Sequence, residues 1–138
     1  MKILKMHYLY YDGDRSNPHN CYPIVKCTIN GVKLNLLIDT GASSSYLEKD
    51  FVEKHPKLKS LMQPLETLKI GSVMYDIESS HFLQTEKLLI DGKRFIEGFY
   101  VAPLNIYKGD KYDGMLGMTF FASYGALIDI KNKEIIIR

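Results

Sequence analysis

Residues 34–43 read LNLLIDTGAS, and this stretch decides the fold of the 138-residue chain. Its even-numbered apolar residues recur with period two, which predicts a half-buried strand with one apolar face. The strand ends on the carboxylate of Asp39, followed by the hydroxyl of Thr40 and by Gly41, which lets the backbone turn sharply. A carboxylate held rigidly at a strand end is suited to acid–base chemistry. The stretch therefore predicts a strand that delivers Asp39 to the edge of a core.

A second motif, Met115-Leu116-Gly117, combines two apolar residues with a glycine that lets two backbone segments approach closely. Residues 38–43 resemble the active-site triplet of the aspartic proteases in its retroviral (retropepsin) form, and the second motif resembles the apolar-apolar-Gly signature of that family. The resemblance covers the chain from about Tyr22 to Arg138 and implies an all-β fold. The expected fold is a retropepsin-like closed β-barrel with one or two short helices and one lobe per chain. We divide the chain into an N-terminal extension or flexible arm, residues 1–20, and a protease domain, residues 21–138.

The resemblance also implies which residues form the site. Asp39, Thr40 and Gly41 are expected to be the catalytic triplet, and Gly117 is expected to support it structurally. The residues expected to contact substrate are Ala42, Ser43, Ile70, Gly71, Ser72, Met115 and Leu116. Within that set, Gly71-Ser72 is predicted as the tip of the flap, the β-hairpin that closes over substrate in this family. An ordinary surface turn at this position is the alternative.

Aspartic protease chemistry needs two carboxyl groups that share one proton across a bound water. The chain carries a single Asp-Thr-Gly triplet, because Asp12, Asp91 and Asp113 each precede glycine directly. We therefore predict a homodimer in which Asp39 of each subunit faces its twin at the two-fold axis. The family implies contacts through the active-site loops and the C-terminal strand, and an edge as apolar as residues 134–137 calls for a partner.

By resemblance, the chain is an aspartic endopeptidase that cleaves a viral or retroelement polyprotein and uses no cofactor. An inserted helix and a long N-terminal segment resemble proteases of plant pararetroviruses and Ty3-type retrotransposons, which predicts the host-cell cytoplasm or a virus particle as location. Retroviral enzymes often carry an acid and an arginine at the positions of Ser43 and Met118, so their absence predicts a weaker dimer. Ala42 cannot donate a hydrogen bond to the catalytic carboxylate, which predicts an optimum at about pH 5–7.

Turn signals recur along the chain and favour strands over helices. Asn30-Gly31 and Asp91-Gly92 predict two tight hairpins, because both positions of such a turn tolerate positive φ. A third hairpin is expected around residues 131–133, and it leads into the apolar strand 134–137.

Two short helices are expected beside the strands. Ser45 and Glu48 form a capping box that predicts a helix over residues 46–55, followed by a loop over residues 56–64. The second helix is predicted over residues 118–124, with the following glycine in the left-handed capping position.

Composition excludes several other classes. A net charge of +2 with interleaved acids and bases gives no footprint for nucleic acid or a membrane surface. We expect no signal peptide and no transmembrane segment, because charged residues interrupt every apolar run. Cys21 and Cys27 have the wrong spacing for a metal or redox motif. The histidines are scattered and are assigned to no metal: His7, His19, His55 and His81.

Two rival hypotheses remain. The first is a non-catalytic binding or dimerisation module with the same fold, against which the intact Asp39-Thr40-Gly41 argues. The second is a phosphotransferase that uses Asp39 as nucleophile, which needs a βαβ arrangement and further acids for magnesium. The alternating strands and hairpin turns argue against this second hypothesis.

Overall fold

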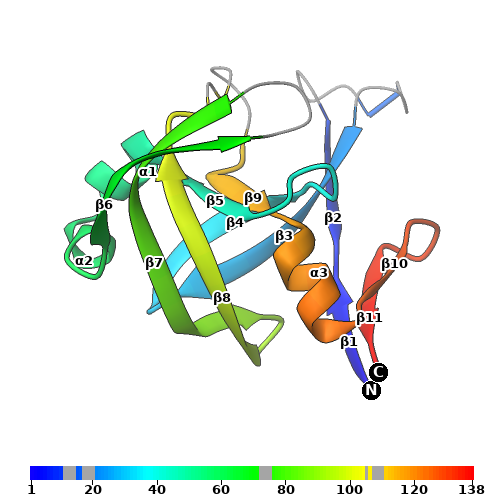
Figure 1. Ribbon diagram of the computed structural model, residues 1–138. Helices are drawn as coiled ribbons and strands as arrows, with labels where there is room; N and C mark the ends of the chain where they lie inside the picture. Colours follow the sequence, from blue (N-terminus) through cyan, green and yellow to red (C-terminus); the bar gives the residue numbers. More distant parts are fainter. Residues whose placement is uncertain (11–14, 17–20, 72–75, 105, 107–110) are drawn as a thin grey trace.

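The two Asx-Gly turns form tight hairpins in the computed structural model of the chain (Figure 1). They join β3 (Cys21–Ile29) to β4 (Val32–Ile38) and β7 (Asp76–Ile90) to β8 (Lys93–Ala102). The turn residues have φ angles of 50° at Asn30, 85° at Gly31, 49° at Asp91 and 73° at Gly92. Both hairpins predicted from the sequence are therefore confirmed, with the positive φ angles that tight turns require.

The structure describes residues 1–10, 15–16, 21–71, 76–104, 106 and 111–138, and over 66–71 and 76–80 it describes the backbone alone. The remaining strands are β1 (Lys2–Lys5), β2 (His7–Tyr10), β5 (Ser45–Glu48), β6 (Gln63–Gly71), β9 (Gly114–Leu116), β10 (Leu127–Asp129) and β11 (Glu134–Ile137). The helices are α1 (Lys49–Glu53), α2 (Pro56–Lys59) and α3 (Met118–Tyr124). No helix in the described part of the chain has the length and hydrophobicity needed to cross a bilayer.

The strands close into a barrel in the order β3, β4, β9, β5, β8 and β7, because β7 pairs back onto β3. Strand β2 extends the sheet beside β3, and β6 extends it beside β7. Within the barrel, β9 lies between β4, to which it is parallel, and β5, to which it is antiparallel. The predicted all-β closed barrel with short helices is confirmed. The neighbouring strands β4, β9 and β5 are the part of the barrel that positions the site.

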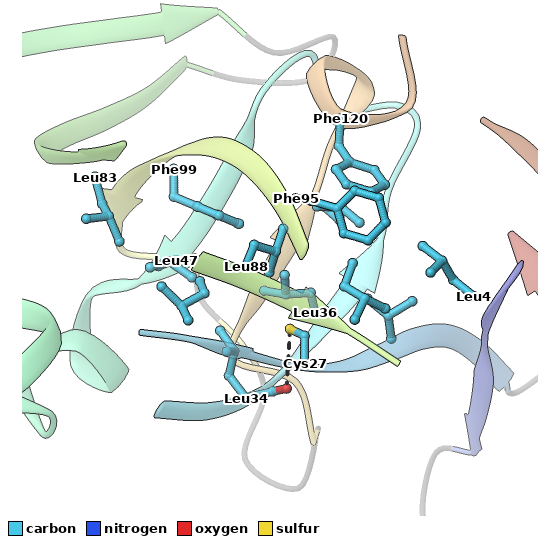
Figure 2. Close-up of a cluster of buried hydrophobic side chains, with 14 of the residues drawn as sticks. Leu4, Cys27, Leu34, Leu36, Leu47, Leu83, Leu88, Phe95, Phe99 and Phe120 are labelled. Atoms are coloured by element: carbon cyan, nitrogen blue, oxygen red, sulfur yellow. Dashed lines mark hydrogen bonds between the residues drawn. The ribbon is translucent and has the colours of Figure 1, made fainter. Parts of the chain in front are cut away.

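Apolar side chains fill the barrel (Figure 2). Leu34 and Leu36, which lie on β4 before Asp39, are 4% and 0% exposed, so one face of β4 lies in the core. Phe95 of β8 and Phe120 of α3 meet edge to face with ring centroids 5.3 Å apart, which packs α3 against the barrel. This packing fixes α3 against β8.

The thiol of Cys27 also belongs to this core. Its Sγ donates a weak hydrogen bond to the carbonyl oxygen of Leu34 at 3.6 Å, drawn as a dashed line in Figure 2. Burial, with a further contribution from Asp113, raises the pKa of Cys27 to about 12. A thiol that stays protonated is a poor nucleophile, so Cys27 serves as a packing residue.

A separate three-stranded sheet joins the two termini in the order β1-β11-β10. The sequence predicts an extension or flexible arm over residues 1–20, whereas residues 2–5 form β1 and residues 7–10 form β2. Leu4 and Met6, which are 0% and 1% exposed, anchor them in the core. The expectation that β11 presents an exposed edge is wrong, because β1 and β10 pair with its two edges within the same chain.

The helix predicted over residues 46–55 is wrong at its start. Residues 45–48 are strand β5, which pairs with both β8 and β9, and helix α1 begins only at Lys49. The capping box does not form: among the described residues no side chain caps α1, and the hydroxyl of Ser45 donates to Glu97 instead. Pairing with two neighbouring strands overrides the local helix signal here.

Of the other two helices, α3 was predicted correctly from the sequence and α2 was not. Helix α3 ends at Gly125 with a φ of 56°, so the predicted helix and its left-handed cap are confirmed. The loop predicted over residues 56–64 instead contains helix α2 and the first residues of β6. Pro56 begins α2, a position that proline favours because its missing N–H has no partner in the first turn.

Candidate active site

Asp39 follows β4 directly, in a turn that hydrogen bonds hold on both sides. The Asp39 amide donates to the carbonyl oxygen of Leu116 in β9 at 3.0 Å, and the Ala42 amide donates to the carbonyl oxygen of Asp39 at 3.1 Å. The amide of Gly41 donates to the carboxylate oxygen Oδ1 of Asp39 at 3.0 Å. The side chain is partly exposed while its backbone is fixed by the core strand and by β9. The carboxylate is therefore rigidly placed and accessible.

The turn is also tied to the start of α3. The amide of Met118 donates to the carbonyl oxygen of Ala42 at 2.8 Å, and that of Thr119 donates to the carbonyl oxygen of Ser43 at 3.1 Å. A Cβ atom at Gly117 would lie 2.2 Å from the carbonyl oxygen of Ser44, which no real side chain allows. Glycine at position 117 is thus what lets the two backbones approach closely enough for these hydrogen bonds.

A buried carboxylate lies behind the turn. Glu97 of β8 is 7% exposed and accepts hydrogen bonds from the hydroxyls of Ser45 and Thr119. The Ser45 hydroxyl in turn accepts a hydrogen bond from the Gly117 amide at 2.9 Å. Glu97 is not among the residues predicted from the sequence, although its position in β8 carries one signal. With period two along β8, Glu97 falls on the inward face between two phenylalanines, where a charged residue is unusual.

A second apolar cluster lies at the same end of the barrel, apart from the main core. Tyr46, Ala102 and Leu104 are buried in it, with Ala42, Tyr100, Ile106 and Met115 packed against them. The cluster brings together two residues that the sequence predicted as substrate contacts, Ala42 and Met115, and it adds tyrosines that the sequence analysis missed. Burial, with the neighbouring Tyr100, raises the pKa of Tyr46, so its phenol stays neutral.

A sequence profile of the family described as "Retroviral aspartyl protease" matches residues 18–138. The chain belongs to this retroviral aspartyl protease family. The comparison with curated proteins found no match. The resemblance to retropepsins drawn from the sequence is confirmed, while the narrower kinship with plant pararetroviral or Ty3-type proteases stays a prediction.

Solved structures with the retropepsin fold superpose on the chain at low sequence identity. The retroviral protease-like domain of Ddi1 from Leishmania major has a TM-score of 0.63 and 23% identity, over 83% of this chain and 86% of that one. A retropepsin-like aspartic protease from Rickettsia conorii has a TM-score of 0.56 and 20% identity, over 97% of this chain and 90% of that one. The EIAV protease complexed with the inhibitor HBY-793 has a TM-score of 0.56 and 24% identity, over 79% and 93%. At these identities the likeness establishes the retropepsin fold alone.

The other predicted site residues take different places in this retropepsin fold. Thr40 and Ser43 are exposed on the turn beside Asp39, whereas Leu116 is fully buried in the main core and supports the turn from beneath. The Leu116 side chain therefore cannot contact a substrate, because a strand of the barrel wall points alternate side chains into the core.

The predicted flap is described only in its two arms. The backbones of β6 and β7 pair there, with Ile70 opposite Ile77 and Gly71 opposite Asp76. Ser72, which the sequence places at the flap tip, lies outside the described residues. Among the residues that the structure does describe, no three His, Cys, Asp or Glu side chains converge as metal ligands would.

Proposed function

We propose that the chain is an aspartic endopeptidase that works as a homodimer, in which the Asp39 carboxyls of two subunits form one catalytic pair. The observation that carries the proposal is a single, accessible carboxylate fixed by backbone hydrogen bonds in a chain of the retroviral aspartyl protease family. One chain supplies only half of the two carboxyl groups that the chemistry needs. A symmetric dimer supplies the other half without any further residue.

In the proposed reaction, one Asp39 carboxylate takes a proton from a water molecule that attacks the peptide carbonyl carbon. The other Asp39, already protonated, donates to the carbonyl oxygen, and a proton then passes to the departing amine. Because the two groups titrate as a pair, the acidic and basic limbs of the pH profile belong to both subunits together. Exposed Thr40, next to Asp39, is proposed to bond across the two-fold axis to the partner's backbone.

The terminal sheet is the second contact that we propose between subunits. The outer edge of β10 takes the role first expected of β11, since β11 is paired on both sides and the β1 backbone already bonds to Asp91 and Lys93. Ile3, Ile136 and Leu127 are opposite one another across the three strands, so they share one face of the sheet. Ile3 and Leu127 are 41% and 49% exposed, and a row of exposed apolar side chains marks an association surface.

The proposed substrate is an extended polypeptide, such as a viral or retroelement polyprotein, with apolar side chains near the cut. The half-buried Ala42 and Met115 of this second cluster support the preference, because they place apolar side chains beside the turn that holds Asp39. An extended peptide binds through its backbone and places alternate side chains in pockets, which suits a wall of this kind.

The test is cleavage of a mixed-sequence peptide library, read by mass spectrometry, with the wild type and Asp39→Asn at equal concentration. We expect the wild type to cleave and a pepstatin-like transition-state mimic to inhibit it, whereas Asp39→Asn loses at least about a thousandfold in rate. Asp50→Asn is the matched control, because Asp50 is an exposed aspartate in the first turn of α1.

Wild-type protein that dimerises and binds the mimic without cleaving any peptide would contradict the proposal. That result would favour the alternative of a non-catalytic binding or dimerisation module with the same fold. Full cleavage by Asp39→Asn would also contradict it, because the activity would then come from another group.

A further inference from the structure

Glu97 is the one charged side chain that is buried among the residues the structure describes. The proposed reaction gives it no role, and burying a carboxylate is costly unless hydrogen bonds compensate it. Its oxygen Oε2 accepts from the Ser45 hydroxyl at 2.8 Å and from the Thr119 hydroxyl at 3.0 Å, and Oε1 accepts from the Gly98 amide at 3.0 Å. All three partners donate, which suits a carboxylate that only accepts.

The hydrogen bonds around Glu97 fix which group donates and which accepts at each position. The Ser45 hydroxyl has one proton, and because it already accepts from the Gly117 amide, that proton is directed to Glu97. The Thr119 hydroxyl donates to the same carboxylate oxygen. Hydrogen bonds to a charged acceptor are stronger than those between neutral groups, so Glu97 is the strongest acceptor at this junction.

The same junction holds the catalytic turn. Ser45 begins β5 directly after the turn, and Gly117 and Thr119 flank Met118, whose amide binds the carbonyl oxygen of Ala42. We infer that Glu97 is a positioning residue for Asp39: its carboxylate locks the turn onto the start of α3. The inference rests on the proposed function, since it assigns Glu97 a part in the same site. A misplacement of about 1 Å at a reacting group costs on the order of a hundredfold in rate, so a lock of this kind affects turnover.

The test uses Thr119, because its side chain is exposed and its replacement leaves the core intact. Thr119→Val removes the hydroxyl with little change of shape, and Thr119→Ser keeps it. We expect Thr119→Val and Glu97→Gln to lower kcat about tenfold or more with KM within about twofold, and Thr119→Ser to retain wild-type kcat. Glu86→Gln is the matched control, because Glu86 is an exposed glutamate of β7. Rates are referred to folded protein, measured by circular dichroism.

Amide hydrogen exchange gives a readout that does not depend on cleavage. In Glu97→Gln we expect faster exchange at the amides of Gly117, Met118 and Thr119, with wild-type protection along the β3–β4 ladder. Wild-type kcat and protection in both Glu97→Gln and Thr119→Val would overturn the inference, as would equal acceleration of all amides, which marks a merely structural role. If the wild type cleaves no peptide, the proposed function fails, whereas the exchange measurement still tests the lock.

Discussion

The turn around Asp39 and the terminal sheet differ in how their side chains and backbone groups are covered. Around Asp39, segments far apart in the sequence are joined by hydrogen bonds: the Asp39 amide donates to β9, and the first amides of α3 donate to the turn. Every buried side-chain nitrogen and oxygen among the described residues has a partner. In the terminal sheet, by contrast, apolar side chains stay at the surface, with Leu127 49% and neighbouring Ile130 59% exposed.

The difference separates a region held by hydrogen bonds within the chain from a region with exposed apolar side chains. Backbone hydrogen bonds to β9 and from α3 of the same chain hold the turn around Asp39. The sheet leaves an apolar row uncovered, on the opposite side of the barrel from α2 (Figure 1). A fixed carboxylate together with an exposed apolar surface is what the proposed homodimer requires of each subunit.

The largest effect on stability and cleavage is expected at Gly117, where the turn and the start of α3 are in close backbone contact. Gly117→Ala places a Cβ atom 2.2 Å from the carbonyl oxygen of Ser44, so the junction must open. We expect a loss of about 3 kcal/mol in the free energy of unfolding and no measurable cleavage. Urea denaturation followed by circular dichroism measures the first, and the peptide assay measures the second.

Gly125→Ala provides the matched comparison. A Cβ atom there meets nothing within 4 Å, and the only strain comes from its φ of 56°. We expect a loss of about 1 kcal/mol with cleavage retained. Equal losses in the two variants would show that the close approach at Gly117 is not what holds the turn.

A smaller effect is expected from the terminal sheet. Leu127→Lys adds a charge to the exposed apolar row and should weaken dimerisation about tenfold, because the apolar surface no longer suits a partner. The unfolding free energy of the monomer should change by less than about 0.5 kcal/mol. Sedimentation across concentration measures the dimer, and cleavage should recover at high protein concentration.

Leu61→Lys is the control for that prediction. Leu61 is 41% exposed and follows α2, across the barrel from the terminal sheet (Figure 1). The same substitution at this position should leave dimerisation unchanged. A dimer as strong in Leu127→Lys as in Leu61→Lys would remove the terminal sheet from the interface.

The smallest effect concerns the hydrogen-bond donors around the Asp39 carboxylate. The Gly41 amide is the donor that the structure shows for Asp39, and Ala42 adds none through its side chain. Ala42→Ser supplies a hydroxyl that favours the charged carboxylate, so the charged form persists to lower pH. We expect the acidic limb of the pH–rate profile to move down by up to about one unit, and an upward or absent shift would contradict this.

What the sequence predicted well was local. Asn30-Gly31 and Asp91-Gly92 specify their hairpins through backbone conformations that few other residues adopt, and Gly125 ends α3 for the same reason. The apolar alternation of β4 likewise predicted the strand that carries Asp39. In each case the determining interaction lies within a few residues of the signal.

What the sequence did not predict depends on distant partners. Ser45 and Glu48 match the capping-box pattern, yet these residues pair with β8 and β9 as strand β5. The internal pairing of β11 depends on β1, from the other end of the chain. Glu97 joins Ser45 and Thr119 only because the barrel closes, so no local pattern links the three.

The most direct test of the central claim is a mixture of equal amounts of wild type and Asp39→Asn at a concentration where dimers form. If each site needs both Asp39 carboxyls, random pairing leaves about one quarter of the rate of the same total amount of wild type. A mixture with Asp50→Asn in place of Asp39→Asn should keep the full rate. A rate of about one half with Asp39→Asn would show that each subunit works alone, and would contradict the account.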